Sequence, residues 1–447
     1  MTMKNRELTK NRSLNFSLAL SLLLSLSICT PTSAQIKSGP MLGYKEMKEV
    51  AIWVQTYGEE ELFFSYKKKK GQHKWAARTY SSSKENAYCF HLIADGLEPG
   101  SDYEYKIHRD KELLAEGEFS TLPLWNYRTD PPNFSFLIGS CTYTNETEYD
   151  RPGKPYGKSM KIFQKMAKKD AEAMLWLGDN IYLREADWGS KSGIQHRYSH
   201  FKWQDSLQEF WKKMHHYAIW DDHDYGPNDA NRSFINKDLT LQAFKDFWAN
   251  PNYGIEGCED CITGMFSYND LDFFLLDNRS QRSPNDRKTG KRQILGDAQI
   301  EWLIDALVSS KARFKIVAIG GQLLSDAAVY ENHATFPEER EKILSLLEKE
   351  EIKNVIFLSG DRHKTELTKY ETENGLLYYD FTSSPLTSTS YNTIDEGNSL
   401  RVEGTHFAKQ NFGMLRMEGT YKERKLILST FDASGKLVWE KEIMPQR

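Results

Sequence analysis

The sequence predicts an α/β domain preceded by a small all-β sandwich. Within segment 39–122, short runs of alternating apolar and polar residues are separated by turn residues, a texture typical of a sandwich. From Phe134 onward, apolar strands alternate with stretches of helical spacing, which indicates an α/β architecture. A chain of 447 residues, 39% of them hydrophobic, is long enough to form a large core and more than one domain.

Residues 1–34 have the layout of a secretory signal peptide. Basic residues at the start precede an apolar run at 18–28, and small residues ending at Ala34 offer a cleavage point. This run is too short to cross a bilayer as a mature helix, and a buried N-terminal helix is the alternative interpretation. We expect export to the periplasm or the cell exterior by the general secretory route. Lipid anchoring at Cys29 is a minor alternative, because the bulky Ile28 precedes it.

The charge of the chain argues against nucleic acid as a main partner. The formal net charge is −4, and removal of segment 1–34, with four basic residues and one acidic, makes it −7. The basic run at 67–70 precedes Gly71, which indicates a solvated hairpin tip. After residue 34, the sequence has no run long and apolar enough to predict a transmembrane helix.

The first domain is expected to span residues 35–125. Its alternating runs predict strands at 50–56, 62–66, 88–92 and 103–107. The segment 97–103 resembles the turn before the tyrosine corner of fibronectin type III-like domains. Pro123, Pro131 and Pro132 mark a linker, so the second domain is expected to span residues 126–447.

Strands and helices alternate in this second domain. Apolar residues three and four positions apart predict helices around Phe163, Leu303 and Leu344. The tail from Asn411 to Glu442 has the texture of strands again. The apolar runs that predict the other strands lie at 134–138, 173–177, 217–220, 273–276, 314–319 and 355–358.

Several of these strands end in Gly or Trp followed by side chains that can bind metal ions. Sites in α/β sheets form at the carboxyl ends of strands, so these side chains are expected to converge. Carboxylates and imidazoles at this density suit a pair of hard or borderline cations. Two cations about 3.5–4 Å apart can orient a phosphoester, generate hydroxide and stabilise the leaving oxygen. The candidates are Cys141, Asp179, Tyr182, Asp221, Asp222, His223, Asp224, Asp361 and His363.

Each motif by itself has a plainer explanation. Gly178-Asp179 is compatible with a turn or a helix cap, the run 221–224 with a solvated loop, and Asp361-Arg-His363 with an internal salt bridge. Four such strand ends in one chain favour a metal site over these separate explanations.

The cysteines outside the signal peptide have different expected roles. Cys258 and Cys261 are spaced C-x-x-C in a loop rich in Gly, Asn and acids, and in an exported protein a local disulfide is the leading interpretation. A zinc site would need two more ligands, and none is evident nearby. Cys89 alternates with Tyr88 and Phe90 in a predicted strand and is expected to be a small buried hydrophobe.

Five motifs, taken in order, resemble the landmarks of the PhoD-like alkaline phosphatases. This family belongs to the metallophosphoesterases and is related to the purple acid phosphatases. The resemblance implies a metallophosphoesterase core of two packed mixed sheets flanked by helices. It covers nearly the whole mature chain, because the family commonly carries a β-sandwich before its catalytic domain. The motifs are Gly139-Ser-Cys141, Gly178-Asp-Asn-Ile-Tyr182, Trp220-Asp-Asp-His-Asp224, Leu276-Asp-Asn-Arg279 and Ser359-Gly-Asp-Arg-His363.

The resemblance implies ligands for two kinds of metal ion. Cys141 and Tyr182 are similar to ligands of a ferric ion, which agrees with the strong Lewis acid that a thiolate and a phenolate need. Asp179 corresponds to a bridging carboxylate, and Asp222 to a ligand of the second metal, calcium, with other divalent cations as alternatives. Asp361 and His363 correspond to closing ligands, one on each side of the pair.

The resemblance also implies two catalytic residues. His223 corresponds to the acid that acts on the phosphate and its leaving group. Arg279 corresponds to a clamp on phosphate oxygens, which guanidinium grips through paired donors. Asn228 is a further candidate ligand, and Lys364, where relatives often have an aromatic residue or His, is expected to alter the substrate rim. A C-terminal lid that some relatives carry has its nearest landmark at Asn411-Phe-Gly413.

Two functions from different classes follow. The first is a secreted metal-dependent phosphomonoesterase or phosphodiesterase acting on small-molecule or lipid phosphate esters. The second is a secreted binding or adhesion protein with a degenerate hydrolase domain. The complete ligand set favours the enzyme, since a degenerate site loses acids that are costly to hold together. Loops at 183–215 and 252–264 are expected to set the depth of the pocket.

Overall fold

The computed structural model describes residues 36–71 and 74–446. The predicted signal peptide and Cys29 lie outside this part of the chain. Within it, no helix has the length and apolar character needed to cross a membrane.

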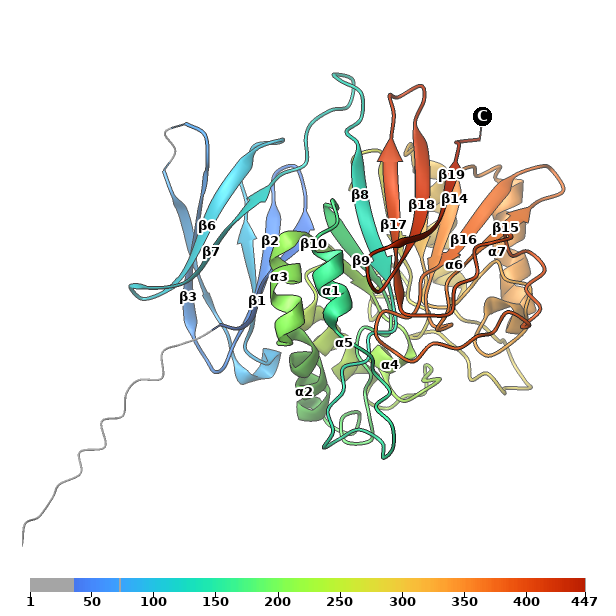
Figure 1. Ribbon diagram of the computed structural model, residues 1–447, viewed down its shortest axis with the longest axis horizontal. Helices are drawn as coiled ribbons and strands as arrows, with labels where there is room; N and C mark the ends of the chain where they lie inside the picture. Colours follow the sequence, from blue (N-terminus) through green and yellow to red (C-terminus); the bar gives the residue numbers. More distant parts are fainter. Residues whose placement is uncertain (1–35, 72–73, 447) are drawn as a thin grey trace, which may run out of the picture. The chain divides into compact units, whose positions relative to one another are not determined.

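A nine-stranded mixed sheet runs through the molecule in the order β19-β18-β17-β8-β9-β10-β1-β2-β5 (Figure 1). Its middle strands β8, β9, β10 and β1 are parallel neighbours. The bounds of its strands are β1 Ile36–Lys45, β2 Val50–Thr56, β5 Cys89–Ala94, β8 Phe134–Gly139, β9 Ala173–Leu177, β10 His215–Ile219, β17 Asn411–Glu418, β18 Lys425–Asp432 and β19 Leu437–Ile443.

A six-stranded sheet packs against the first, in the order β11-β12-β13-β14-β16-β15. Its strands β12, β13, β14 and β16 are parallel neighbours. Their bounds are β11 Gly264–Tyr268, β12 Leu271–Leu275, β13 Phe314–Ala318, β14 Val355–Ser359, β15 Glu366–Glu371 and β16 Leu377–Thr382.

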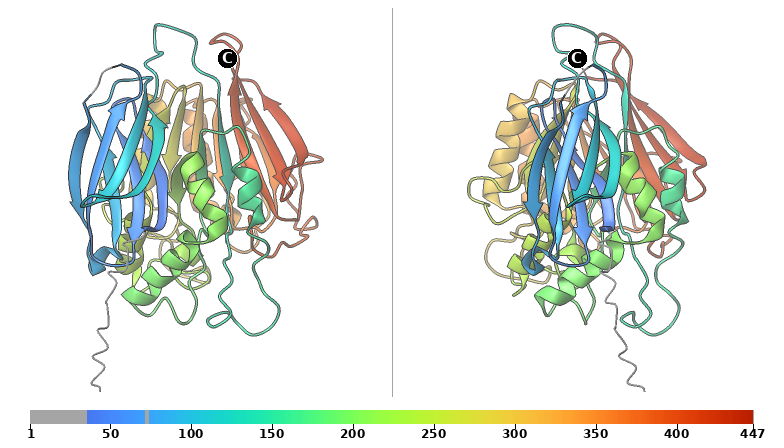
Figure 2. Two further views of the ribbon diagram at one scale, coloured as in Figure 1. Left: turned by 60° about the vertical axis from the view of Figure 1, so that its left-hand side comes forward. Right: turned by 90° about the vertical axis from the view of Figure 1, so that its left-hand side faces the viewer.

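Aromatic side chains join the facing surfaces of these two sheets. The Phe136 ring on β8 stacks on Phe273 of β12, with centroids 4.8 Å apart, and Tyr217 on β10 stacks on Phe266 of β11 at 3.9 Å. Rings of this size contribute large buried apolar areas and restrict how the sheets can slide. Two packed mixed sheets with helices on their outer faces confirm the predicted fold class (Figure 2).

Helices cover the outer faces of both sheets. The helices α6 and α7 pack on the six-stranded sheet, where Leu303 and Leu347 share a core with Phe357. The predicted helices around Phe163, Leu303 and Leu344 are therefore confirmed. The helical segments are α1 Lys161–Met166, α2 Lys191–Lys202, α3 Asp205–Lys213, α4 Asp222–Tyr225, α5 Lys237–Phe247, α6 Asp297–Ser309 and α7 Pro337–Lys349, with 3-10 turns η1 Lys84–Asn86 and η2 His333–Thr335.

The N-terminal all-β region is a two-layer sandwich, as predicted. A four-stranded sheet in the order β4-β3-β6-β7 packs on β1, β2 and β5 around a shared apolar core. The backbone N–H of Glu98 donates to the Tyr103 hydroxyl at 2.8 Å, which is the contact of a tyrosine corner. The four strands are β3 Glu61–Lys68, β4 Ala76–Ser81, β6 Asp102–Arg109 and β7 Glu112–Ser120.

One layer of the sandwich is part of the large sheet. The strand β1 pairs in parallel with β10, with Leu42 opposite His215. The backbone N–H of Tyr44 also donates to the Ala249 carbonyl at 3.0 Å. The domain boundary near residue 125 therefore stays a prediction, because hydrogen bonds continue across the two regions that it would separate.

Two expectations about individual segments are wrong. The Asn411-Phe-Gly413 landmark begins β17, which pairs with β8 inside the large sheet and is no lid. Cys258 and Cys261 are free thiols in the structure, and the Cys261 Sγ lies 2.6 Å from the Cys258 carbonyl oxygen, so the expected disulfide is absent. Cys89 is buried at 3% exposure, as expected for a small core residue.

Candidate metal centre

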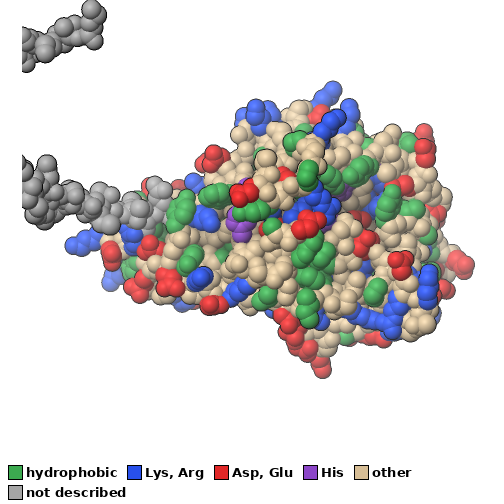
Figure 3. Space-filling model, turned by 90° about the horizontal axis from the view of Figure 1, so that it is seen from below, with side chains coloured by type: hydrophobic (Ala, Val, Ile, Leu, Met, Phe, Trp, Pro, Cys, Tyr) green, Lys and Arg blue, Asp and Glu red, His purple; other side chains and the backbone are tan. Residues whose placement is uncertain are grey.

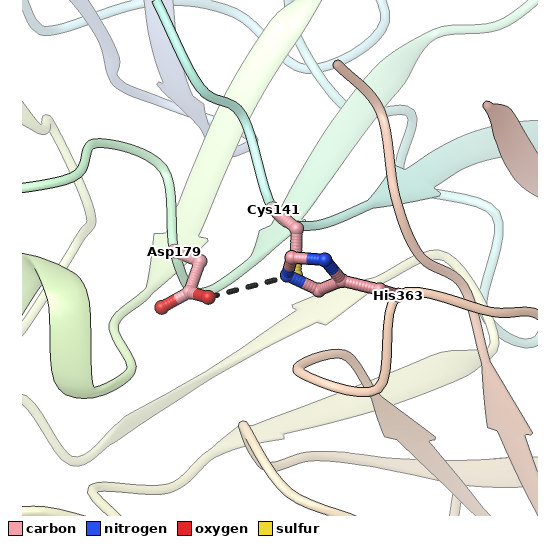
Figure 4. Close-up of side chains that lie close together, drawn as sticks. All are labelled: Cys141, Asp179 and His363. Carbon is pink, nitrogen blue, oxygen red and sulfur yellow. Dashed lines mark hydrogen bonds between the residues drawn. The ribbon is translucent and has the colours of Figure 1, made fainter. Parts of the chain in front are cut away.

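The predicted ligands follow the carboxyl ends of parallel strands. Cys141 comes after β8, Asp179 after β9, Asp222 after β10, and both Asp361 and His363 after β14. Parallel strands in a sheet end at the same edge, so residues that directly follow them become neighbours. Figure 4 shows Cys141, Asp179 and His363 approaching one another from three separate segments of the chain.

Sharp backbone turns at these strand ends aim the side chains inward. Cys141, Asp179, Asp361 and His363 all have positive φ, between 51° and 61°. Such left-handed conformations cost about 1–3 kcal/mol each for residues other than Gly, and they cluster at functional sites. The preceding Gly178 is also needed for space, since a Cβ there would lie 2.7 Å from the Asp221 Cβ.

Four side chains present ligand atoms around one point. The Cys141 Sγ lies 3.5 Å from Asp179 Oδ2, and the Tyr182 hydroxyl donates to the same oxygen at 3.0 Å. The Tyr182 hydroxyl is also 3.1 Å from His363 Nε2. Sulfur, phenol oxygen, carboxylate oxygen and imidazole nitrogen of four buried residues therefore lie close together.

The segment after β16, which the sequence did not mark, supports these four groups. The Ser384 hydroxyl donates to Cys141 Sγ at 3.1 Å, and the Ser388 hydroxyl donates to the Tyr182 oxygen at 3.0 Å. The His363 Nδ1 lies 2.5 Å from the Thr389 carbonyl. A proton on Nδ1 would leave the Nε2 lone pair directed at the other ligands, which is how outer contacts orient metal-binding histidines.

A second group of acids adjoins the first. Asp179 also lies with Asp222 and His223 in a cluster whose potential ligand atoms are within 4.8 Å of one another. Asp222 and Asp361 form a further cluster with Asp221. Asp179 therefore belongs to two of these clusters, and its role as a bridge stays a prediction.

The electrostatics of this cluster suit positive charge. Burial and the charges of neighbouring acids raise the pKa of Asp179 well above its usual value, and burial chiefly raises the pKa of Asp361 to about 6. Burial and the Asp179 charge likewise raise the pKa of the Cys141 thiol and the Tyr182 phenol. A bound cation would reverse these shifts, because it stabilises the ionised forms.

Three carboxylate oxygens without hydrogen bonds also indicate a cation site. Asp221 Oδ2, Asp222 Oδ1 and Asp361 Oδ2 are buried and accept no hydrogen bond from the described residues. Arg279 and Arg362 lie at ion-pair distance from two of them, 3.9 Å from Asp222 Oδ1 and 3.7 Å from Asp361 Oδ2. Buried carboxylate oxygens without hydrogen bonds are costly, so the three atoms fit ligands of a cation.

Arg279 pairs with buried acids beside the cluster. Its side chain is completely buried, and its Nε donates to Asp221 Oδ1 at 2.6 Å while Nη2 donates to Glu331 Oε2 at 2.6 Å. Asp221 in turn caps α4 by accepting from the Asp222 N–H at 3.0 Å. In the structure this guanidinium therefore holds buried acids beside the cluster, and its role toward phosphate stays a prediction.

Glu331 is the acid that the sequence analysis missed. It lies in the loop before η2, follows no strand directly, and clusters with Asp222 and Asp229. Its carboxylate pairs with Arg282 as well as with Arg279, at 3.1 Å and 2.6 Å. No local pattern in the sequence marks such a residue, because its partners are far away along the chain.

A cleft of about 710 Å³ opens beside the cluster, lined by residues that include Tyr156, Arg184, His223 and Asn228. Much of its wall comes from the loop at 145–156, which projects at the bottom of Figure 1. Figure 3 views this side and shows acidic, basic and apolar side chains intermixed across it. Of the two loops expected to set the depth of the pocket, the one at 252–264 does not line this cleft.

Asn228 and Lys364 differ in how they relate to this site. Asn228 is exposed at the cleft wall, and its role as a ligand stays a prediction. Lys364 is buried and pairs with Glu396 at 2.7 Å and Glu366 at 3.5 Å. It therefore lies beneath the surface and does not alter the substrate rim as expected.

Replacing Arg279 should destabilise the protein. Arg279→Met would leave Asp221 and Glu331 buried without their counter-charge, which typically costs about 3–5 kcal/mol of unfolding free energy. Urea unfolding measures the loss, and Arg279→Lys should lose less because it keeps the charge. Arg287→Met, in an exposed loop, is the control. Unchanged stability together with weakened substrate binding would instead support the predicted role of Arg279 as a phosphate clamp.

Comparison with known proteins agrees with this architecture. A family model described as PhoD-like phosphatase matches residues 136–425, and one for a domain of unknown function, DUF7800, matches residues 33–124. Alkaline phosphatase D of Bacillus subtilis (strain 168) is 22% identical over 373 residues, which are 73% of this chain and 62% of that protein. The chain thus spans less than two thirds of the length of this curated relative.

Solved structures share the fold. A structure of PhoD matches with a TM-score of 0.75 at 17% identity and covers 93% of both chains. Purple acid phosphatase PPD1 from yellow lupin (Lupinus luteus) seeds matches with a TM-score of 0.66 at 15% identity, covering 90% of this chain and 73% of that one. Since the PhoD-like model covers more than half of the sequence, the protein belongs to the PhoD-like phosphatase family.

Proposed function

We propose that this protein is an exported, metal-dependent phosphoesterase that hydrolyses small-molecule or lipid phosphate esters. The observation that carries the proposal is the meeting of Cys141, Asp179, Tyr182 and His363 around one point, with Asp179 shared by a second acid cluster. Family membership supports the same activity. Export rests on the predicted signal peptide and remains part of the proposal.

The donor sets support two unlike metal ions. Cys141 and Tyr182 would hold a ferric ion with His363, whose Nε2 lies near the phenol, and Asp179 would bridge. Asp222 and Asp361, whose oxygens cluster on the other side, would hold calcium or another divalent cation. When bound, such a pair supplies Lewis acidity and an activated water for attack on phosphorus.

Residues of the chain orient the reaction around this pair. The His223 ring lies 4.2 Å from the Tyr182 ring, which fixes the imidazole beside the cleft. We infer that His223 delivers a proton to the leaving oxygen. Burial lowers the pKa of His223 to about 4, and the negative charge of a bound phosphate ester would favour its protonated form.

The proposed function is tested by hydrolysis of an aryl phosphate and of the matching aryl diester. Wild-type protein should hydrolyse at least one, and metal removal by a chelator should abolish turnover. Asp179→Ala should lose both activity and bound metal, measured by elemental analysis, because the bridging position is removed. Glu209→Ala is the control, since that side chain is 87% exposed on α3. Failure of the wild type on both esters would favour a binding protein with a degenerate hydrolase domain.

Tyr182→Phe should remove visible colour. A phenolate on ferric iron absorbs visible light by charge transfer, so the oxidised wild type is expected to be coloured and this variant bleached. Tyr143→Phe is the matched control, because its ring lies 5.1 Å from Tyr182 but its hydroxyl bonds Asp150. An iron-free, colourless wild type with full activity would contradict the ferric assignment.

His223→Ala should impair turnover most on esters with poor leaving groups. General acid catalysis typically contributes about 10²–10⁴-fold, and an acidic leaving group needs little of it. We therefore expect near-normal metal content and a rate loss that grows with the basicity of the leaving group in a series of aryl and alkyl phosphates. Equal losses across the series with depleted metal would identify His223 as a ligand.

A further inference from the structure

Arg184 is a buried arginine at the wall of the cleft. It lies two residues after Tyr182, is 6% exposed, and lines the cleft together with His223. Its backbone is held in place, since the Arg184 N–H donates to Asp187 Oδ2 at 2.8 Å.

Aromatic groups orient the guanidinium of Arg184. Its Nε donates to the Tyr143 hydroxyl at 3.2 Å, and its central carbon lies 4.7 Å from the Tyr143 ring centroid and 5.3 Å from that of Tyr182. Of the N–H groups of the guanidinium, these contacts use only Nε. The Nη1 and Nη2 groups donate to no residue of the described chain and are not among its buried atoms without a partner, so both are open to the solvent of the cleft.

Arg184 differs from the other buried arginines in residues 36–71 and 74–446. Each of those others has a carboxylate within ion-pair distance, whereas none pairs with Arg184: Arg197 pairs with Asp187, Arg279 with Asp221, Arg282 with Glu331, Arg362 with Glu396 and Arg424 with Asp270. Arginine stays charged at all ordinary pH values, so a largely buried guanidinium that has no carboxylate of the described residues beside it and opens onto the cleft favours the binding of an anion there.

We propose that Arg184 binds the non-bridging oxygens of the substrate phosphoryl group, and of released inorganic phosphate, through its Nη groups. Tyr143 acts as a positioning residue that orients the guanidinium. This inference rests on the proposed function and assigns to Arg184 the phosphate contact that the sequence suggested for Arg279. The planar fork matches two oxygens of a tetrahedral phosphate, and partial burial strengthens each charge-assisted hydrogen bond.

Inorganic phosphate is the probe for this proposal, used on the metal-loaded full-length protein. Arg184→Gln should weaken phosphate binding, measured by calorimetry and as competitive inhibition, by about 10- to 100-fold, since hydrogen bonds to charged groups contribute about 1.5–3 kcal/mol. Arg184→Lys keeps the charge but loses the planar guanidinium. Its affinity for phosphate should lie between those of the wild type and Arg184→Gln. Metal content should equal that of the wild type in every variant.

Two further variants distinguish direct phosphate binding by Arg184 from a general effect of positive charge at the cleft. Arg151→Gln, on the same cleft and paired with Glu185 at 2.7 Å, has a side chain 62% exposed and should change phosphate affinity by less than about 3-fold. Tyr143→Phe keeps Arg184 but frees its Nε, and should weaken phosphate binding by about 3- to 10-fold. Because Tyr143→Phe and Arg184→Lys are mild changes, they test the proposal even if Arg184→Gln folds poorly.

Phosphate affinity equal to that of the wild type in Arg184→Gln or, should that variant not fold, in both Arg184→Lys and Tyr143→Phe would overturn the inference. This outcome is distinct from failure of the proposed function, in which the wild type hydrolyses no phosphate ester. Calorimetry also reports on Arg184 independently of turnover, because it measures phosphate binding directly.

Discussion

The burial of several acidic side chains at one point is the constraint on which the rest of this structure depends. Asp179, Asp221, Asp222 and Asp361 lie together at the ends of parallel strands, where burial and neighbouring acids raise the pKa of Asp179, Asp221 and Asp361, while His223 and Arg279, against the effect of burial, hold the pKa of Asp222 below its usual value. Arg279 offsets part of this repulsion from within the protein. Several oxygens of these acids still accept no hydrogen bond from the described residues, so folding and metal binding are expected to be coupled.

The same constraint explains the strand–glycine pattern of the sequence. Acids from neighbouring strands can approach one another only where the backbone turns sharply and no side chain intervenes. A Cβ at Gly178 would meet Asp221, and one at Gly320 would lie 2.5 Å from the Asp221 carboxylate. The positive φ of Asp179 and Asp361 adds local strain that the packed sheets must hold. The aromatic contacts between the sheets, such as Phe136 on Phe273, contribute this rigidity.

Much of the fold and the core of the site could be predicted from local patterns. Cys141, Asp179 and Asp361 each directly follow an apolar run, and a parallel strand carries its next residues to a shared edge. Glu331 and Arg184 follow no such rule. The position of Glu331 depends on its ion pairs with Arg279 and Arg282. The proposed role of Arg184 depends on the observation that no carboxylate of the described residues lies within ion-pair distance of it. Both are relations between segments distant in the sequence.

The sequence by itself determined the fold class, the strand ends that carry ligands and the aromatic corner at Tyr103, because each is encoded in residues close together in the chain. Only the tertiary structure decided which side chains are buried around the site and which charged groups pair there. It directed Arg279 to buried acids, placed Lys364 beneath the surface, and joined β1 to β10 so that the sandwich extends the large sheet. The physical reason is that burial and charge pairing depend on the neighbours that folding brings together.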